Sequence, residues 1–150
     1  MSAETAMDQA IAEARAAAER GEVPVGAVVV DAEGRILAKA GNRVEADNDP
    51  TAHAEVLALR AAARTLGTPR LVDCDLYVTL EPCAMCAQAI AFARIRRLVF
   101  GAYDAKGGGV EHGARMFEQA TCHHRPEVIG GVREAEAAAM LIRFFEERRD

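Results

Sequence analysis

Apolar and polar residues follow one another along this chain with the periods of helices and strands. Residues 5–20 carry apolar side chains at helical spacing and end before Gly21, which predicts an amphipathic first helix. The apolar run Val25–Val30 and the mixed segment Arg35–Ala40 flank the turn residues 31–34, which predicts a β-hairpin. Because the first run is rich in β-branched residues, we expect that strand to be buried on both faces.

The remaining chain alternates between strands and helices. Asp49-Pro50-Thr51 supplies cap and first-turn residues for a second helix, which places His53 in its first turn. The later elements predicted are a strand at 75–80, a helix from Pro82 through Ala93, strands at 97–101 and near 128–129, and a helix from about 134 to 149. This order implies an α/β fold with part of its sheet parallel, in which ligands collect at strand ends and helix N-termini.

Composition limits what the chain can be. It has 150 residues, 51% of them hydrophobic, which is enough for one domain (1–150) with its own core. No apolar stretch approaches the roughly 20 residues of a membrane span, and the N-terminus resembles no signal peptide, so we expect a cytoplasmic protein. The net charge of -5 argues against non-specific coating of nucleic acid, although a local basic patch remains compatible with it.

Three residues have the spacing of a metal site. Cys83 and Cys86 form a Cys-x-x-Cys pair at the predicted start of a helix, and His53 precedes them by about thirty residues at the start of another. Two thiolates and one imidazole can hold zinc. Because three protein ligands leave one coordination position open, the pattern favours a catalytic zinc over a structural one.

A carboxylate accompanies these residues. Glu55 follows His53 by two positions, where it can accept a proton from an attacking water and pass it to a leaving group. A Cys-x-x-Cys pair alone is equally compatible with a redox pair or half of a zinc knuckle, and a lone His-x-Glu is usually surface. Their joint occurrence in this order favours catalysis.

The pattern H-x-E followed by P-C-x-x-C is that of the zinc-dependent nucleobase deaminases. Further blocks extend the match over almost the whole chain: residues 22–27, 41–43, 49–55, 76–83 and 100–106, with Phe144-Phe145 and Arg148-Arg149 near the end. With these blocks the sequence resembles the bacterial tRNA-specific adenosine deaminases, a branch of the cytidine and deoxycytidylate deaminase superfamily.

The resemblance implies a three-layer α/β/α fold with a central mixed five-stranded sheet, and a homodimer with one zinc ion per subunit. It assigns zinc binding to His53, Cys83 and Cys86, and proton transfer to Glu55. It also implies four substrate-binding residues: Asn42, which contacts the flipped base or its ribose, Val25 and Ala54, which line the base pocket, and Asp104, in a loop that meets the RNA backbone.

The activity implied is conversion of adenosine to inosine at the wobble position (34) of a tRNA anticodon, with release of ammonia. Two alternatives remain at this point: a deaminase of guanine or another small nucleobase or nucleoside with the same zinc chemistry, and a non-catalytic zinc-binding module. Glu55 argues against the module, because a structural zinc site has no use for a neighbouring carboxylate. Basic candidates for RNA contact are Arg43, Lys106, Arg94–Arg97 and Arg148–Arg149. Cys122, His123 and His124 are interpreted as exposed loop residues rather than a second metal site.

Overall fold

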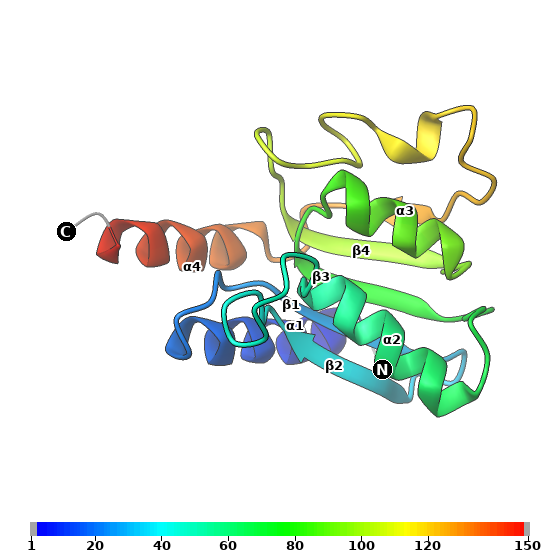
Figure 1. Cartoon of the computed structure of the whole chain (residues 1–150), viewed down its shortest axis with the longest axis horizontal. Coiled ribbons are helices and arrows are strands. Elements are labelled where there is room, and N and C mark those ends of the chain that lie inside the picture. The colour runs from blue at the N-terminus through cyan, green and yellow to red at the C-terminus, as the bar shows by residue number, and fades with distance from the viewer. Residues whose placement is uncertain (1–2, 149–150) are drawn as a thin grey trace.

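A five-stranded sheet lies between two layers of helices in the computed structural model, which describes residues 3–148 (Figure 1). In chain order the elements are α1 (Ala3–Glu19), β1 (Gly26–Val30), β2 (Ile36–Gly41), α2 (Ala54–Leu66), β3 (Asp75–Leu80), α3 (Ala84–Phe92), β4 (Arg97–Ala102), the short 3-10 helix η1 (Met116–Glu118), β5 (Glu127–Ile129) and α4 (Glu134–Glu147). The predicted three-layer α/β/α fold with a mixed sheet is confirmed.

The sheet has the strand order β2-β1-β3-β4-β5. β1 is antiparallel to both β2 and β3, whereas β3, β4 and β5 run parallel. The predicted hairpin is confirmed, and β1 is buried at every position. Ala27 and Val29 pack into the core on the α2 and α3 side, and Val28 and Val30 pack against α1, so alternate side chains of one strand serve both layers.

Helix α1 lies unusually close to the sheet. A Cβ atom at Gly26 would overlap the carbonyl oxygen of Ala10, so only glycine permits this approach. Among the described residues, no helix combines the length and the hydropathy that crossing a membrane requires.

The starts of α2 and α3 differ from the prediction. Asp49 does not cap α2: its carboxylate accepts hydrogen bonds from the backbone N–H and the hydroxyl of Thr51, which closes a separate turn. The helix begins at Ala54, with His53 as its N-cap. Similarly, α3 begins two residues after Pro82, with Cys83 as its N-cap. The expectation that His53 lies inside the first turn is therefore wrong, and two candidate zinc ligands stand at the two helix caps.

Candidate metal centre and active site

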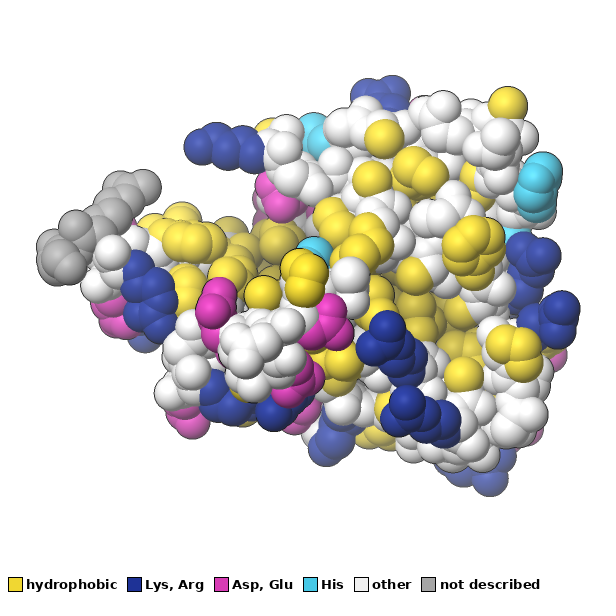
Figure 2. All heavy atoms as spheres, in the orientation of Figure 1, with side chains coloured by type: hydrophobic (Ala, Val, Ile, Leu, Met, Phe, Trp, Pro, Cys, Tyr) yellow, Lys and Arg dark blue, Asp and Glu magenta, His cyan; other side chains and the backbone are white. Residues whose placement is uncertain are grey.

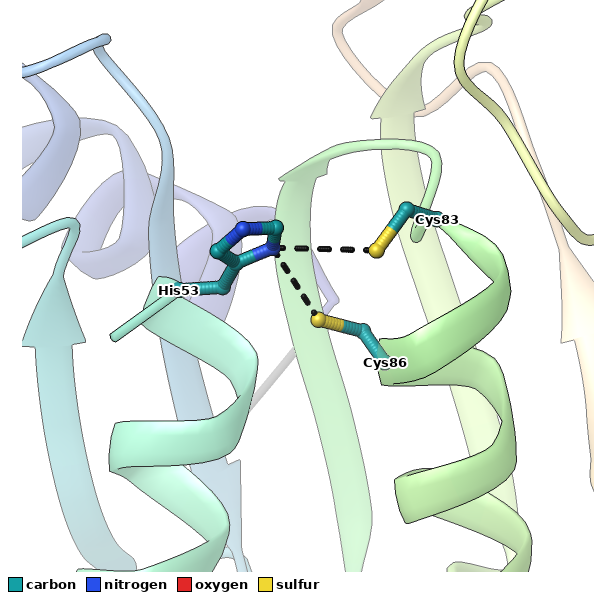
Figure 3. Close-up of side chains that lie close together, drawn as sticks. All are labelled: His53, Cys83 and Cys86. Carbon is teal, nitrogen blue, oxygen red and sulfur yellow. Dashed lines mark hydrogen bonds between the residues drawn. The ribbon is translucent and has the colours of Figure 1, made fainter. Parts of the chain in front are cut away.

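The N-termini of α2 and α3 bring three ligand atoms to one point (Figure 3). The Nδ1 atom of His53 lies 3.7 Å from Sγ of Cys83 and 3.4 Å from Sγ of Cys86. All three atoms lie within 4.8 Å of one another. Neither His53 nor Cys83 uses its side chain to cap its own helix, so both side chains are available to this centre.

The spacing fits a zinc ion. Zinc bonds of about 2.3 Å to sulfur and 2.0–2.1 Å to nitrogen, at tetrahedral angles, separate the two ligand atoms by about 3.6 Å. The observed 3.4 and 3.7 Å lie on either side of that value. The donor set therefore suits Zn²⁺ in both chemistry and geometry.

The two thiols are electrostatically unequal. A hydrogen bond from the Cys86 thiol, assisted by His53, lowers the pKa of Cys83 to about 4. The same interaction with the Cys83 thiolate, together with burial, raises the pKa of Cys86 above its ordinary value. The hydrogen bond to Cys83 also raises the pKa of His53. Cys86 must therefore give up its proton when a metal binds, because thiolate is the ligand form.

Glu55 lies beside this centre in the first turn of α2 and is 4% exposed. Burial raises the pKa of Glu55 to about 7. A carboxyl group with such a pKa can both accept and release a proton near neutral pH.

A cavity of about 640 Å³ opens above these residues. Such a volume is typical of small-molecule and nucleobase sites. Seven of the residues singled out from the sequence line it: Val25, Asn42, His53, Glu55, Cys83, Asp104 and Arg148. Cys86 is fully buried next to it. The structure thus brings together side chains from β3–α3, from the start of α2 and from the segments around β1, β2 and β4.

Asn42 and Ala54 contact each other directly. The side-chain oxygen of Asn42 accepts a hydrogen bond of 2.7 Å from the backbone N–H of Ala54, in the first turn of α2. Ala54 is fully buried and is not among the residues that line the cavity. Since the Asn42 oxygen is engaged, its side-chain NH₂ is the group that remains for a ligand.

Sequence reasoning assigned no role to several residues of the cavity. Phe144 of α4 is one of them and forms part of the cavity wall. Next to it in the wall lies Arg148, which the sequence did mark as a candidate for RNA contact, with its guanidinium 3.9 Å from the centroid of the Phe144 ring. Glu22 and Glu81 are buried carboxylates in the same lining. Burial acts to raise the pKa of Glu81, but hydrogen bonds from neighbouring backbone groups and from His112 outweigh it and hold the pKa below its usual range. The only sign of a role for Glu81 in the sequence was its position directly before the Pro82-Cys83 pair.

Cys122 and His124 are not among the residues that line the cavity. The Cys122 thiol donates to the carbonyl of His124, whose Nε2 contacts the carbonyl of Ile95 at 2.7 Å. Cys122 is buried rather than exposed, because it packs into the main core. Among the described residues, His53, Cys83 and Cys86 are the one group with metal-ligand spacing.

Comparison with known proteins agrees with this chemistry. Residues 1–102 match the family model of the cytidine and deoxycytidylate deaminase zinc-binding region. The chain belongs to this deaminase family. The predicted enzyme class, a zinc-dependent hydrolytic deaminase, is confirmed.

Within the family, the resemblance to tRNA-specific adenosine deaminases is also confirmed. The chain is 57% identical to the tRNA-specific adenosine deaminase of Agrobacterium fabrum over 143 residues, which are 95% of this chain and 93% of that relative. A solved structure from work on A-to-I editing by tRNA:A34 deaminases is 57% identical, with a TM-score of 0.89 over 91% of this chain and 99% of that one. A guanine deaminase from Nitrosomonas europaea shares the fold at 26% identity, with a TM-score of 0.80 over 94% of this chain and 83% of that one.

Proposed function

We propose that this protein, as a single domain of residues 1–150, deaminates adenosine to inosine at the wobble position (34) of a tRNA anticodon. The observation that carries the proposal is the buried Glu55 beside the His53, Cys83 and Cys86 donor atoms, at the base of a cavity of about 640 Å³. The high identity to a tRNA-specific adenosine deaminase favours this substrate over guanine.

In this proposal His53, Cys83 and Cys86 hold one zinc ion per subunit. Bound zinc supplies Lewis acidity, which makes a water molecule nucleophilic near neutral pH. Glu55 accepts a proton from the attacking water and delivers it to the amino group at C6 of adenine. Water adds at C6, the C6–N bond breaks, and ammonia leaves, which turns adenosine into inosine.

The residues around the base have separate roles in the proposal. Val25 gives the cavity an apolar wall, and the NH₂ of Asn42 donates a hydrogen bond to the base or its ribose, while its oxygen holds α2. Ala54 supports that contact through its backbone N–H. Asp104 shapes the neighbouring loop, because its side chain accepts the backbone N–H groups of Lys106 and Gly107.

A single-stranded loop suits such a site. The adenine must leave its stack to reach the base of the cavity, and unstacking costs less in an anticodon loop than in a duplex. We therefore take the tRNA anticodon stem-loop as the substrate, and the cytoplasm, where tRNA is modified, as the location.

The proposal includes a homodimer. Large apolar side chains are exposed on α2, on α3 and on the segment after α2, among them Leu66 (43% exposed), Val72 (62%), Met85 (38%) and Phe92 (70%). Between α2 and α3 lies a groove of about 320 Å³ lined mainly by apolar residues, and Figure 2 shows hydrophobic side chains gathered over this face. We assign the groove to a second copy of the chain, the partner that the family resemblance implies.

One experiment separates the candidate substrates. The purified zinc protein is incubated with an anticodon stem-loop that carries adenosine at position 34, with a matched stem-loop that carries it at position 35, and with free adenosine and guanine. Mass spectrometry of digested RNA should detect inosine only from the first substrate. Turnover of guanine without inosine in the RNA would replace the proposal with the guanine deaminase alternative.

The role of Glu55 is tested by Glu55→Gln. The variant should retain its zinc and lose about 10²–10⁴-fold or more in turnover, because proton transfer by a positioned side chain contributes a factor of that size. Zinc is measured by atomic absorption and turnover on the stem-loop. Loss of zinc together with activity would show that Glu55 is a metal ligand rather than the proton carrier.

A further inference from the structure

Two buried glutamates beside the cavity have no part in the proposed chemistry. Glu22 follows α1 and Glu81 follows β3, and each residue is 2% exposed. Burying a carboxylate is costly unless hydrogen bonds satisfy it. In both cases the bonds come from backbone N–H groups of a loop at the mouth of the cavity.

Glu22 holds the loop of residues 43–49, which we call the first rim. Its two carboxylate oxygens accept the backbone N–H groups of Glu45 at 3.1 Å and Ala46 at 2.8 Å. The rim has no fully buried side chain, and residues 45–48 are exposed. Hydrogen bonds rather than apolar packing therefore hold this segment, of which Glu45 and Val44 line the cavity.

Glu81 holds the loop of residues 104–112, which we call the second rim. One carboxylate oxygen accepts the N–H of Asp104 at 3.0 Å and contacts Nδ1 of His112 at 2.8 Å. The other accepts three successive N–H groups, those of Val110, Glu111 and His112, at 2.9–3.2 Å. Glu81 is thus an anion enclosed by the backbone dipoles of one rim.

The second rim also lies against the turn at Pro82–Ala84, which carries the candidate zinc ligand Cys83. The N–H of Gly109 donates to the carbonyl of Pro82 at 2.8 Å. A Cβ atom at Gly108 would overlap the Glu81 carboxylate, and one at Gly109 would overlap the backbone of Ala84. The close approach of this rim to Glu81 therefore depends on Gly108, and its close approach to the start of α3 depends on Gly109.

We propose that Glu22 and Glu81 are positioning residues that fix the two rims before substrate enters, and so restrict the cavity to a nucleotide extruded from an RNA loop. The inference rests on the proposed function for its substrate. A loop that is ordered in the free protein does not have to be ordered on binding, so preorganised rims strengthen the binding of the RNA. Neither glutamate takes part in the chemical step.

The test compares Glu22→Gln and Glu81→Gln with the matched control Asp75→Asn. An amide keeps the size of the side chain but loses the charge and one of the two acceptor oxygens. Asp75 is also a buried carboxylate, 5% exposed, but it accepts two hydrogen bonds from Arg96 and begins β3, the strand that Glu81 follows. The control thus disturbs the same strand at its other end, away from the rims.

Each glutamine variant should keep its zinc and show a KM for the stem-loop raised about tenfold or more, equivalent to about 1.4 kcal/mol, with a much smaller change in kcat. Amide hydrogen exchange should accelerate at Glu45 and Ala46 in Glu22→Gln, and at residues 110–112 in Glu81→Gln. Asp75→Asn should lower the melting temperature and leave both KM and the exchange of the rims unchanged.

Three results would overturn the inference: unchanged exchange in the rims, an equal rise of KM in Asp75→Asn, or loss of zinc in the glutamine variants, which would assign the carboxylates to the metal site instead. Because the two rims are held independently, either variant tests the idea if the other does not fold. If the wild-type protein fails to deaminate the stem-loop, the proposed function fails, whereas the exchange measurements still decide whether the glutamates hold the rims.

Discussion

Asn42 both stabilises the start of α2 and lines the cavity, and substitutions can separate these two roles. Its side-chain oxygen accepts the N–H of Ala54 at 2.7 Å, which supplies the cap that the N-cap residue His53 does not provide. Asn42→Ala removes this acceptor and leaves the buried Ala54 N–H without its partner. Asn42→Asp keeps an acceptor at the positive end of α2 but removes the NH₂ that we propose donates to the substrate.

The size of each effect follows from these contacts. A buried N–H left without a partner costs about 1–3 kcal/mol. For a chain of this length, 1 kcal/mol corresponds to about 2–4 °C, so Asn42→Ala should melt about 4–8 °C lower for a loss of about 2 kcal/mol. Asn42→Asp should melt within about 2 °C of the wild type. Because one hydrogen bond contributes about 0.5–1.5 kcal/mol, its KM for the stem-loop should rise about 2- to 12-fold.

Differential scanning calorimetry of the zinc-loaded proteins gives the melting temperatures, and steady-state kinetics on the stem-loop gives KM. A wild-type melting temperature for Asn42→Ala would refute the capping role. A wild-type KM for Asn42→Asp would refute the contact between the Asn42 NH₂ and the substrate, whatever the stability of that variant.

Three other predictions concern metal, assembly and RNA binding. Cys86→Ala should weaken zinc binding by about 100-fold or more and abolish turnover, as measured by competition with a chelator; retained zinc would remove Cys86 from the ligand set. Phe92→Arg should convert a dimer to a monomer in analytical ultracentrifugation, whereas Ile142→Arg, at a residue 59% exposed on α4, should not; equal effects would place the interface elsewhere. Lys106→Ala and Arg148→Ala should each reduce the slope of log affinity against log salt by about 0.7, and unchanged slopes would show that neither contacts phosphate.

Local patterns predicted the strands well. The hairpin of β1 and β2 and the limits of β3 follow from apolar runs and turn residues that lie within a few positions of one another. The start of α2 was harder, because Asp49-Pro50-Thr51 carries the usual signals of a helix N-terminus. In the fold, Asp49 closes its own turn with Thr51, and the acceptor that caps α2 comes from Asn42, on the far side of the loop. No local pattern contains that contact.

In the candidate site, too, local sequence predicted some features, whereas others depend on distant contacts. The spacing of His53, Cys83 and Cys86 predicted a three-ligand centre, and the geometry agrees with it because each half stands at the start of a helix. The enclosure of the site depends on distant contacts instead. Phe144 and the α4 helix reach the cavity from the end of the chain, and the burial of Glu81 depends on a loop about 30 residues later, so neither is visible in the sequence around it.

The distribution of charge explains how a protein of net charge -5 can act on RNA. Several basic candidates are already neutralised by partners: Arg43 pairs with Asp47, and Arg96 with Asp75. Arg94 and Arg96 line a different surface depression from the proposed site.

Lys106 and Arg148 have no ion-pair partner among the described side chains, those of residues 5–148. Both border a second cavity, and Arg148 also lines the proposed site. Arg149 lies outside the described residues. With about two phosphate contacts, the salt-dependent attraction to single-stranded RNA is small, since its slope is about 0.7 per contact. We therefore expect most of the binding free energy to come from enclosing one base between the rims that we propose Glu22 and Glu81 to hold. Such a protein should discriminate by the shape of a loop and should have little affinity for RNA in general.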